Sequence, residues 1–307
     1  MIFNGALIPQ AKNYIGILQN ISQNPAWRDP TLVENSVCRY YQWLSLRLKT
    51  NVMLPIPEDI QFILNVHMLH PVDYFTVMNV FLKMQSPNME VLATINPSGE
   101  QLAWFQNAWN NEYQEDVNAP SVKRIEQFKH LLNVPVGVDL VKSAIGQAEF
   151  LNKLLELAGN NIELIIADPF LERALIDYRK FLYLRKVTPK GAYIVPSMFI
   201  DLMWHSHMLF PMQYYADTQC LTGSVLDHDD SLGDNVLKDN WKKTHVSWRK
   251  HYGENLIAHS AEAFLAAPTT FGRGKRKGKG KHKEKIKFED SSTSLSTSFS
   301  DDASEIG

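Results

Sequence analysis

The chain has 307 residues, of which 45% are hydrophobic and 21% are charged, a balance typical of folded proteins rather than disordered ones. No apolar run approaches the length of about 18 residues that a membrane-spanning helix needs, and the N-terminus lacks the features of a secretory signal. The only cysteines, Cys38 and Cys220, are too few for a disulfide framework or a cysteine metal cluster. We therefore expect a reduced, intracellular protein without a transmembrane segment, located in the cytoplasm or the nucleus.

The formal net charge of −2 is unevenly distributed. Residues 1–270 carry 22 Lys and Arg against 27 Asp and Glu, a net charge of −5, whereas residues 271–307 carry 9 against 6, a net charge of +3. Near Thr270 the apolar residues become rare, and a Gly/Lys-rich stretch is followed by a Ser/Thr-rich acidic end. Such segments bury too little apolar surface to offset the entropy of ordering. We expect residues 266–307 to form a disordered tail.

Three segments of the first half of the chain recur in the second half in the same order. RYYQWLSLRLK (39–49) matches DYRKFLYLRK (177–186), EDIQFILNVHMLHPVDYF (58–75) matches MFIDLMWHSHMLFPMQYY (198–215), and WNNEYQED (109–116) matches WRKHYGEN (248–255). The offset between matched positions is nearly the same in all three, which predicts an internal duplication. We expect a degenerate first copy over residues 1–125 and a second copy over residues 126–265, packed together.

The local patterns in the second copy favour helices. Residues 139–159 have apolar side chains at helical spacing, an Asp near the start and Gly159 past the end. Residues 170–186 repeat the pattern with basic residues in the last turn, where the helix dipole favours them. Ser197 can cap a helix that Pro211 stops, and Pro211 can open the next one. Since alternating strand patterns are scarce, we expect an all-α protein.

The stretch IDLMWHSHMLFP, residues 200–211, contains His205 and His207. Residues two apart on a helix point about 200° apart, so these two imidazoles are expected to have different roles. His207 has a counterpart, His67, in the first copy, which favours an architectural role in which both donate to nearby backbone carbonyls. We assign structural roles to His67, His207, Trp204, Pro211, Tyr214, Trp248 and Tyr252.

Asp201 and His205 lie one helical turn apart and occur only in the second copy, because the first copy has Gln61 and Asn65 instead. The turn VLDHDD (225–230), which also lacks a counterpart, adds three carboxylates and an imidazole. Such groups can hold a divalent ion, but they also suit a solvated loop, a helix cap and a network in which Asp201 orients His205. The candidate ligands of one divalent ion are Asp201, His205, His228 and Asp229.

The tail carries nine basic residues among the fifteen from Arg273 to Lys287. This stretch can serve as a nuclear-localisation segment or a contact to nucleic acid or an anionic surface, and it can equally be a solubilising end. The candidate contact residues are Arg273, Lys275, Arg276, Lys277, Lys279 and Lys281.

The second copy resembles the glycine-rich domain-containing protein-like family of plants and fungi, long described as a domain of unknown function. The resemblance lies in a Tyr-containing amphipathic helix, a VP-x-x-x-IDL-x-WH-x-H segment, an HDD turn and a later T-x-x-x-W-x-x-x-YG helix. The matching residues are Tyr178, Val195, Pro196, Ile200, Asp201, Leu202, Trp204, His205, His207, Leu209, Pro211, Tyr214, Tyr215, His228, Asp229, Asp230, Thr244, Trp248, Tyr252 and Gly253.

The resemblance implies no established reaction. Plant members of this family are associated with osmotic stress, abscisic-acid responses and development, and some carry an RNA-recognition-like segment. This sequence differs from them, because it has no RNP-type aromatic motif and only a short Gly/Lys tail. Our first hypothesis is therefore a non-enzymatic helical interaction or regulatory module with an unknown protein partner and no established cofactor. The alternative is a metal-dependent, hydrolase-like enzyme built around Asp201, His205 and the DHDD turn.

Overall fold

The computed structural model describes residues 6–81, 92–94, 96–119, 123–131, 136–189, 193–228 and 234–267. These residues all belong to one compact unit, Met1–Gly272, which spans both predicted copies. Apart from residues 266 and 267, the predicted tail lies outside the described residues. In the part of the chain that the structure describes, no helix is both long enough and apolar enough to cross a membrane.

The described chain is mostly helical, as predicted. The α-helices of the first half are α1 (Leu7–Gln23), α2 (Pro30–Thr50), α3 (Glu58–Met68), α4 (Pro71–Phe81) and α6 (Gly99–Tyr113). Those of the second half are α7 (Leu140–Leu157), α8 (Ile162–Ile166), α9 (Asp168–Val187), α10 (Met198–Met208), α11 (Pro211–Thr222), α12 (Asp234–Tyr252) and α13 (Ala261–Ala266). Short 3-10 turns are η1 (Pro25–Arg28), η2 (Ile125–Gln127) and η3 (Lys129–Leu131).

The purely helical expectation misses one small feature. Strands β1 (Leu54–Pro55) and β2 (Ala93–Thr94) form a parallel pair in which Leu54 lies opposite Ala93. The Trp43 indole donates to the Pro55 carbonyl at 2.9 Å, which ties this pair to α2. A pairing of two residues per strand leaves no alternating pattern for sequence analysis to detect.

The helix ends follow the local chemistry. Asp139 caps α7 by accepting from the Lys142 backbone N–H at 3.0 Å, and Gly159 beyond its end has a positive φ of 61°. Ser197 caps α10 by accepting from the Ile200 N–H at 3.3 Å. Pro211 begins α11, where its fixed φ suits the first turn and its missing N–H costs no hydrogen bond.

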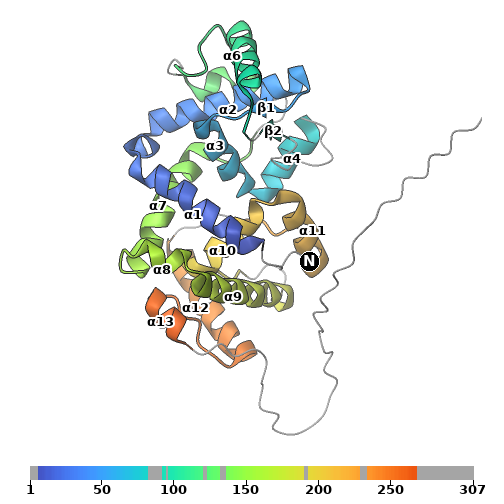
Figure 1. Ribbon diagram of the computed structural model, residues 1–307. Coiled ribbons are helices and arrows are strands. Elements are labelled where there is room, and N and C mark those ends of the chain that lie inside the picture. The colour runs from blue at the N-terminus through green and yellow to red at the C-terminus, as the bar shows by residue number, and fades with distance from the viewer. Residues whose placement is uncertain are drawn as a thin grey trace, which may run out of the picture. The chain divides into compact units, whose positions relative to one another are not determined.

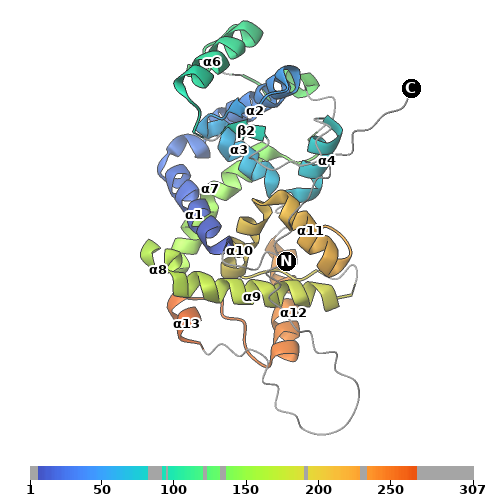
Figure 2. The same cartoon turned by 45° about the vertical axis from the view of Figure 1, so that its right-hand side comes forward.

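The leading helix of each half packs against the other half. In Figures 1 and 2, α1 lies against α9 and α10, whereas α7 lies against α2 and α3. The two leading helices also pack against each other. One continuous hydrophobic core therefore includes helices from both ends of the chain, with Trp43, Trp109 and Trp248 fully buried in it.

Candidate metal site

Two parts of the second half of the chain supply the candidate site. Asp201 and His205 lie one turn apart on α10, so both side chains emerge from the same face of that helix. His228 comes from segment 225–228, which has no regular secondary structure and follows α11 and the bend at Gly223, where φ is 79°. The Tyr214 hydroxyl donates to the Leu226 carbonyl at 2.7 Å and accepts from the Trp204 indole at 2.8 Å, which holds this segment against α10.

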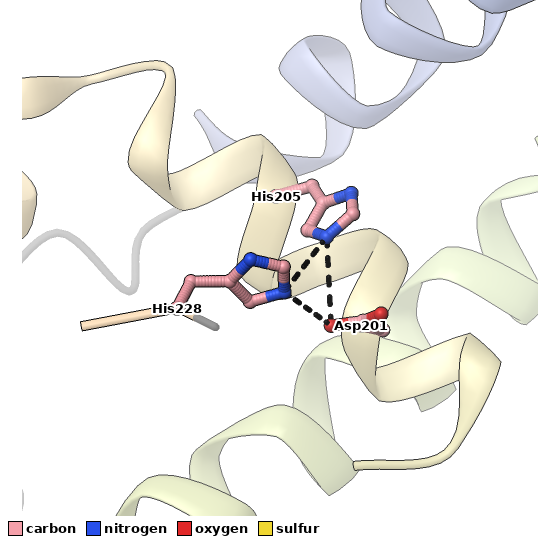
Figure 3. A group of neighbouring side chains, drawn as sticks. All are labelled: Asp201, His205 and His228. Carbon is pink, nitrogen blue, oxygen red and sulfur yellow. Dashed lines mark hydrogen bonds and ion pairs between the residues drawn. The ribbon is translucent and has the colours of Figure 1, made fainter. Parts of the chain in front are cut away.

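Three donor atoms converge between α10 and this segment (Figure 3). The Nε2 atoms of His205 and His228 are 3.1 Å apart. The Asp201 Oδ1 atom lies 3.6 Å from His205 Nε2 and 3.5 Å from His228 Nε2. The three atoms thus form a nearly equilateral triangle.

This triangle fits the ligand set of one divalent ion. Donors bound to a tetrahedral Zn²⁺ at about 2.0–2.1 Å lie about 3.4 Å from one another. The Asp201–imidazole separations exceed the usual N–H···O distance of about 2.9 Å, and Asp201 Oδ1 makes no hydrogen bond with any described residue. A buried carboxylate oxygen that faces two imidazole nitrogens without bonding to them is well placed to share an ion with them.

Burial and charge act in opposite directions on Asp201. Burial raises the pKa of its carboxyl, but the electrostatic interactions with His205 and His228 outweigh burial and hold the pKa below its ordinary value. The carboxylate is therefore in the ionised form that a metal ion needs. The side chains of Asp201, His205 and His228 are 19%, 1% and 7% exposed, so the small opening of the site lies at Asp201.

Aromatic rings wall the site. The Phe150 ring lies 4.7 Å from the His205 ring, and the Trp204 ring meets the His228 ring edge-on at 5.1 Å. Such apolar walls lower the local dielectric, which strengthens the attraction between a bound cation and the Asp201 carboxylate.

His207 points away from this triangle. Its Nδ1 atom is 2.9 Å from the Tyr178 hydroxyl, and its Nε2 atom is 3.5 Å from Asp217 Oδ2. Both are side-chain partners, whereas a backbone carbonyl was expected from the sequence.

His67 makes the same kind of contacts in the first half of the chain. Its Nδ1 atom is 2.8 Å from the Tyr40 hydroxyl, and its Nε2 atom is 2.9 Å from Asp73 Oδ2. The backbone-carbonyl expectation for His67 is therefore wrong, because a Tyr and an Asp from neighbouring helices occupy both ring nitrogens. Burial lowers the pKa of His67 although Asp73 opposes that shift.

The other residues with predicted structural roles lie in the core or at helix ends. The Trp204 indole donates a hydrogen bond to the Tyr214 hydroxyl, and Pro211 begins α11. Trp248 is fully buried on α12, with the Lys180 ammonium 5.8 Å from its ring centroid. The fourth predicted ligand, Asp229, and the six basic tail residues lie outside the described residues.

Tyr14 and Gln147, which are far from the site in the chain, support it and were not predicted from the sequence. The Tyr14 hydroxyl on α1 lies 3.1 Å from His205 Nδ1, and it also donates to Gln147 Oε1 on α7 at 2.5 Å. Tyr14 is 191 residues from His205 in the chain. No local spacing signals such a contact, since it depends on how α1 packs on the second half.

Comparisons with known proteins agree with the resemblance noted above. Residues 92–217 match the family described as "Glycine-rich domain-containing protein-like". "Glycine-rich domain-containing protein 1" of Arabidopsis thaliana is 26% identical over 265 residues. Over residues 92–217 the chain is thus similar to the glycine-rich domain-containing protein-like family. Asp201 and His205 lie within the matched residues 92–217, and His228 lies beyond them.

The family relatives are much longer than this chain. The match to "Glycine-rich domain-containing protein 1" covers 80% of this chain and 32% of the relative. "Glycine-rich domain-containing protein 2" of Arabidopsis thaliana is 26% identical over 271 residues, which cover 80% of this chain and 33% of the relative. The chain thus spans about a third of the length of these relatives. No solved structure matches the chain.

Proposed function

We propose that this chain is a duplicated helical module whose second copy alone binds one divalent metal ion, through Asp201, His205 and His228. The observation that supports the ion most directly is the triangle of donor atoms, all within 4.8 Å of one another. Two imidazoles and one carboxylate suit Zn²⁺ and its neighbours in the first transition row better than Mg²⁺ or Ca²⁺, which prefer oxygen ligands.

Three protein ligands leave at least one coordination position for water or a substrate. Zinc sites with three protein ligands and one open position are characteristic of catalysis, where the ion lowers the pKa of its bound water. The opening at Asp201 would admit that water. If this site has an enzymatic role, we therefore propose metal-dependent hydrolysis. Asp229, the residue after His228, is the candidate for a further ligand.

The metal proposal is tested on the full chain, stripped of metal and titrated with Zn²⁺. We expect one ion per chain, and we expect Asp201→Asn and His205→Ala to lose it. Asp217→Asn is the matched control, since Asp217 also faces a buried histidine of α10 but belongs to no three-ligand group among the described residues. A chain that binds no ion, or that binds it equally well without Asp201 or His205, would contradict the proposal.

The duplication is supported by a hydrogen bond that occurs in both halves. Tyr40 on α2 reaches His67 on α3 at 2.8 Å, and Tyr178 on α9 reaches His207 on α10 at 2.9 Å. The two tyrosines are matched with each other in the repeat, and so are the two histidines. Both bonds tie the long helix of a half, α2 or α9, to the helix that ends before a proline, α3 or α10.

A second pair of matched contacts joins α6 to α2 in the first half and α12 to α9 in the second half. Tyr113 donates to the Gln42 carbonyl at 2.6 Å, and Tyr252 donates to the Lys180 carbonyl at 2.7 Å. Gln42 and Lys180 occupy the same place in the repeat, since each lies two residues after the matched tyrosine of its long helix. The repeated contacts support a shared architecture for the two halves.

The leading helices extend this correspondence beyond the segments that sequence comparison matched. Buried residues of α1 correspond to buried residues of α7 at a constant offset of 133 residues, the offset between Tyr14 and Gln147. The matched pairs are Leu7 and Leu140, Ala11 and Ala144, Tyr14 and Gln147, Leu18 and Leu151, and Ile21 and Leu154. We propose that each copy begins with this helix and that the two copies have exchanged it, because α1 and α7 each pack on the other copy.

The interaction role of the module is a further part of the proposal. We assign it an unknown protein partner inside the cell, with the basic stretch from Arg273 to Lys287 as an added contact to nucleic acid or an anionic surface. Such a contact releases counterions, so it weakens steeply as salt rises. Binding of the full chain to RNA, DNA or anionic vesicles should fall with salt and be lost in a chain that ends at residue 270. Equal binding by the shortened chain would contradict this role.

A further inference from the structure

A chain of three buried polar groups leads from the candidate metal site to the leading helices. His205 on α10 lies 3.1 Å through its Nδ1 atom from the hydroxyl of Tyr14 on α1. That hydroxyl lies 2.5 Å from Oε1 of Gln147 on α7. Tyr14 and Gln147 are 1% and 4% exposed, so both groups are shielded from water.

The chemistry of these groups fixes the position of each proton. The Gln147 amide oxygen can only accept, so the single Tyr14 O–H proton is donated to it. The Tyr14 oxygen then has only lone pairs to offer His205, and a 3.1 Å bond between them requires a proton on Nδ1. A neutral imidazole with its proton on Nδ1 has its lone pair on Nε2, the atom that faces Asp201 and His228.

We infer that Tyr14 and Gln147 are positioning residues of the metal site, which hold His205 in the tautomer that presents Nε2 to the ion. The inference rests on the proposed function, because it concerns the same ion. Histidine ligands of metal ions usually donate their second N–H to a group of this kind, and loss of that partner typically weakens metal binding about 10- to 100-fold.

The positioning groups also connect the ion to the packing of the two halves. Tyr14 and Gln147 belong to the leading helices, which pack on each other as well as on the opposite halves. A metal ligand is therefore oriented by two helices that lie outside its own helix. Ion binding and the packing of α1 on α10 should accordingly stabilise each other.

The tautomer can be measured without any metal, by ¹⁵N NMR of the histidine rings in the metal-free full chain. We expect His205 to carry its proton on Nδ1. In Gln147→Met the acceptor is gone, so the Tyr14 proton can turn to Nδ1 and the His205 proton should move to Nε2. A proton on Nε2 of His205 in the unaltered chain would overturn the inference.

The effect on the ion is measured by Co²⁺ titration, followed by the visible absorption of the bound ion. We expect Tyr14→Phe and Gln147→Met to weaken Co²⁺ binding about 10- to 100-fold. The matched control is Tyr40→Phe, which removes an equally buried hydroxyl from another histidine, His67, that lies outside the triangle. Its Co²⁺ affinity should equal that of the unaltered chain.

The outcomes separate this inference from the proposed function. If the unaltered chain binds Co²⁺ and Tyr14→Phe binds it equally well, the positioning role is wrong and the metal site stands. A similar loss of Co²⁺ affinity in Tyr14→Phe and Tyr40→Phe would mean that general destabilisation causes the loss, and it would also overturn the positioning role. If the unaltered chain binds no Co²⁺, both proposals fail.

Discussion

Burial raises the pKa of Asp177 to about 6, although Lys180 and Arg173 oppose the shift. The native state therefore holds this proton more tightly than the unfolded chain, where the ordinary value is 3.8. The stability that comes from this group is complete below pH 3.8 and is lost as the pH rises through about 6.

We predict that Asp177→Asn removes a pH-dependent part of the stability, worth about 3 kcal/mol at most. Urea unfolding between pH 4 and pH 7 measures it, because the free energy of unfolding should fall less over this range in the variant than in the unaltered chain. Asp239→Asn changes a mostly exposed carboxylate and should keep the original slope. Parallel pH profiles for Asp177→Asn and the unaltered chain would contradict the assignment.

The two cysteines differ in reactivity for a similar reason. Cys38 is fully buried, and burial together with the charge of Glu34 raises the pKa of its thiol to about 12. Cys220 is exposed. Since the thiolate is the reactive form, we predict that a thiol reagent at pH 8 modifies one cysteine of the folded chain and two after unfolding. Rapid modification of folded Cys220→Ser would show that Cys38 is accessible after all.

At the level of residues, the sequence predicted different roles for His205 and His207 of α10 but did not predict their partners. Asp201 and His205 could be proposed as a pair because helical spacing is local and because the matched positions of the first half hold Gln61 and Asn65. The contribution of Tyr14 depends on the packing of α1 against α10, which no spacing within the chain encodes. Local geometry was predictable, and long-range partners were not.

At the level of elements, a buried ion pair anchors the segment that follows α12 to α9. The Lys180 ammonium lies 2.5 Å from Glu254 Oε1, and the two side chains are only 9% and 15% exposed. In the first half, Glu115 pairs with Lys123 at 2.5 Å, and these side chains are 10% and 7% exposed. A shielded lysine–glutamate contact thus follows α6 in the first half and α12 in the second.

We predict that Glu254→Gln lowers the free energy of unfolding by about 2–4 kcal/mol, because it leaves the Lys180 charge buried without its nearest acid. Thermal and urea unfolding measure the change. The exposed pair of Lys242 and Asp239 provides the control, and Lys242→Ala should cost less than about 0.5 kcal/mol. Equal effects in the two variants would mean that burial does not govern the strength of the pair.

The helices themselves could be predicted where caps and prolines mark their ends. Asp139, Ser197 and Pro211 mark helix ends in the structure as their residue types predict. The pairing of β1 with β2 and the packing of α1 and α7 on the opposite halves could not be predicted, because both depend on contacts between residues far apart in the chain.

At the level of the whole molecule, the proposed exchange of leading helices makes the halves depend on each other. Without α1, the faces of α9 and α10 that it covers would lose apolar contacts, and α2 and α3 would lose the same kind of cover without α7. We predict a single cooperative unfolding transition for the full chain and no cooperative transition for residues 1–125 or 126–265 expressed alone. Circular dichroism and tryptophan fluorescence during unfolding measure this. A stable, cooperatively melting fragment would contradict the exchange.

The most direct test of the metal site is anomalous diffraction at the zinc absorption edge, from crystals of the full chain grown with Zn²⁺. We predict one strong anomalous peak about 2.0–2.2 Å from Asp201 Oδ1 and from the Nε2 atoms of His205 and His228. Well-ordered electron density for these three side chains without an anomalous peak between them would contradict it.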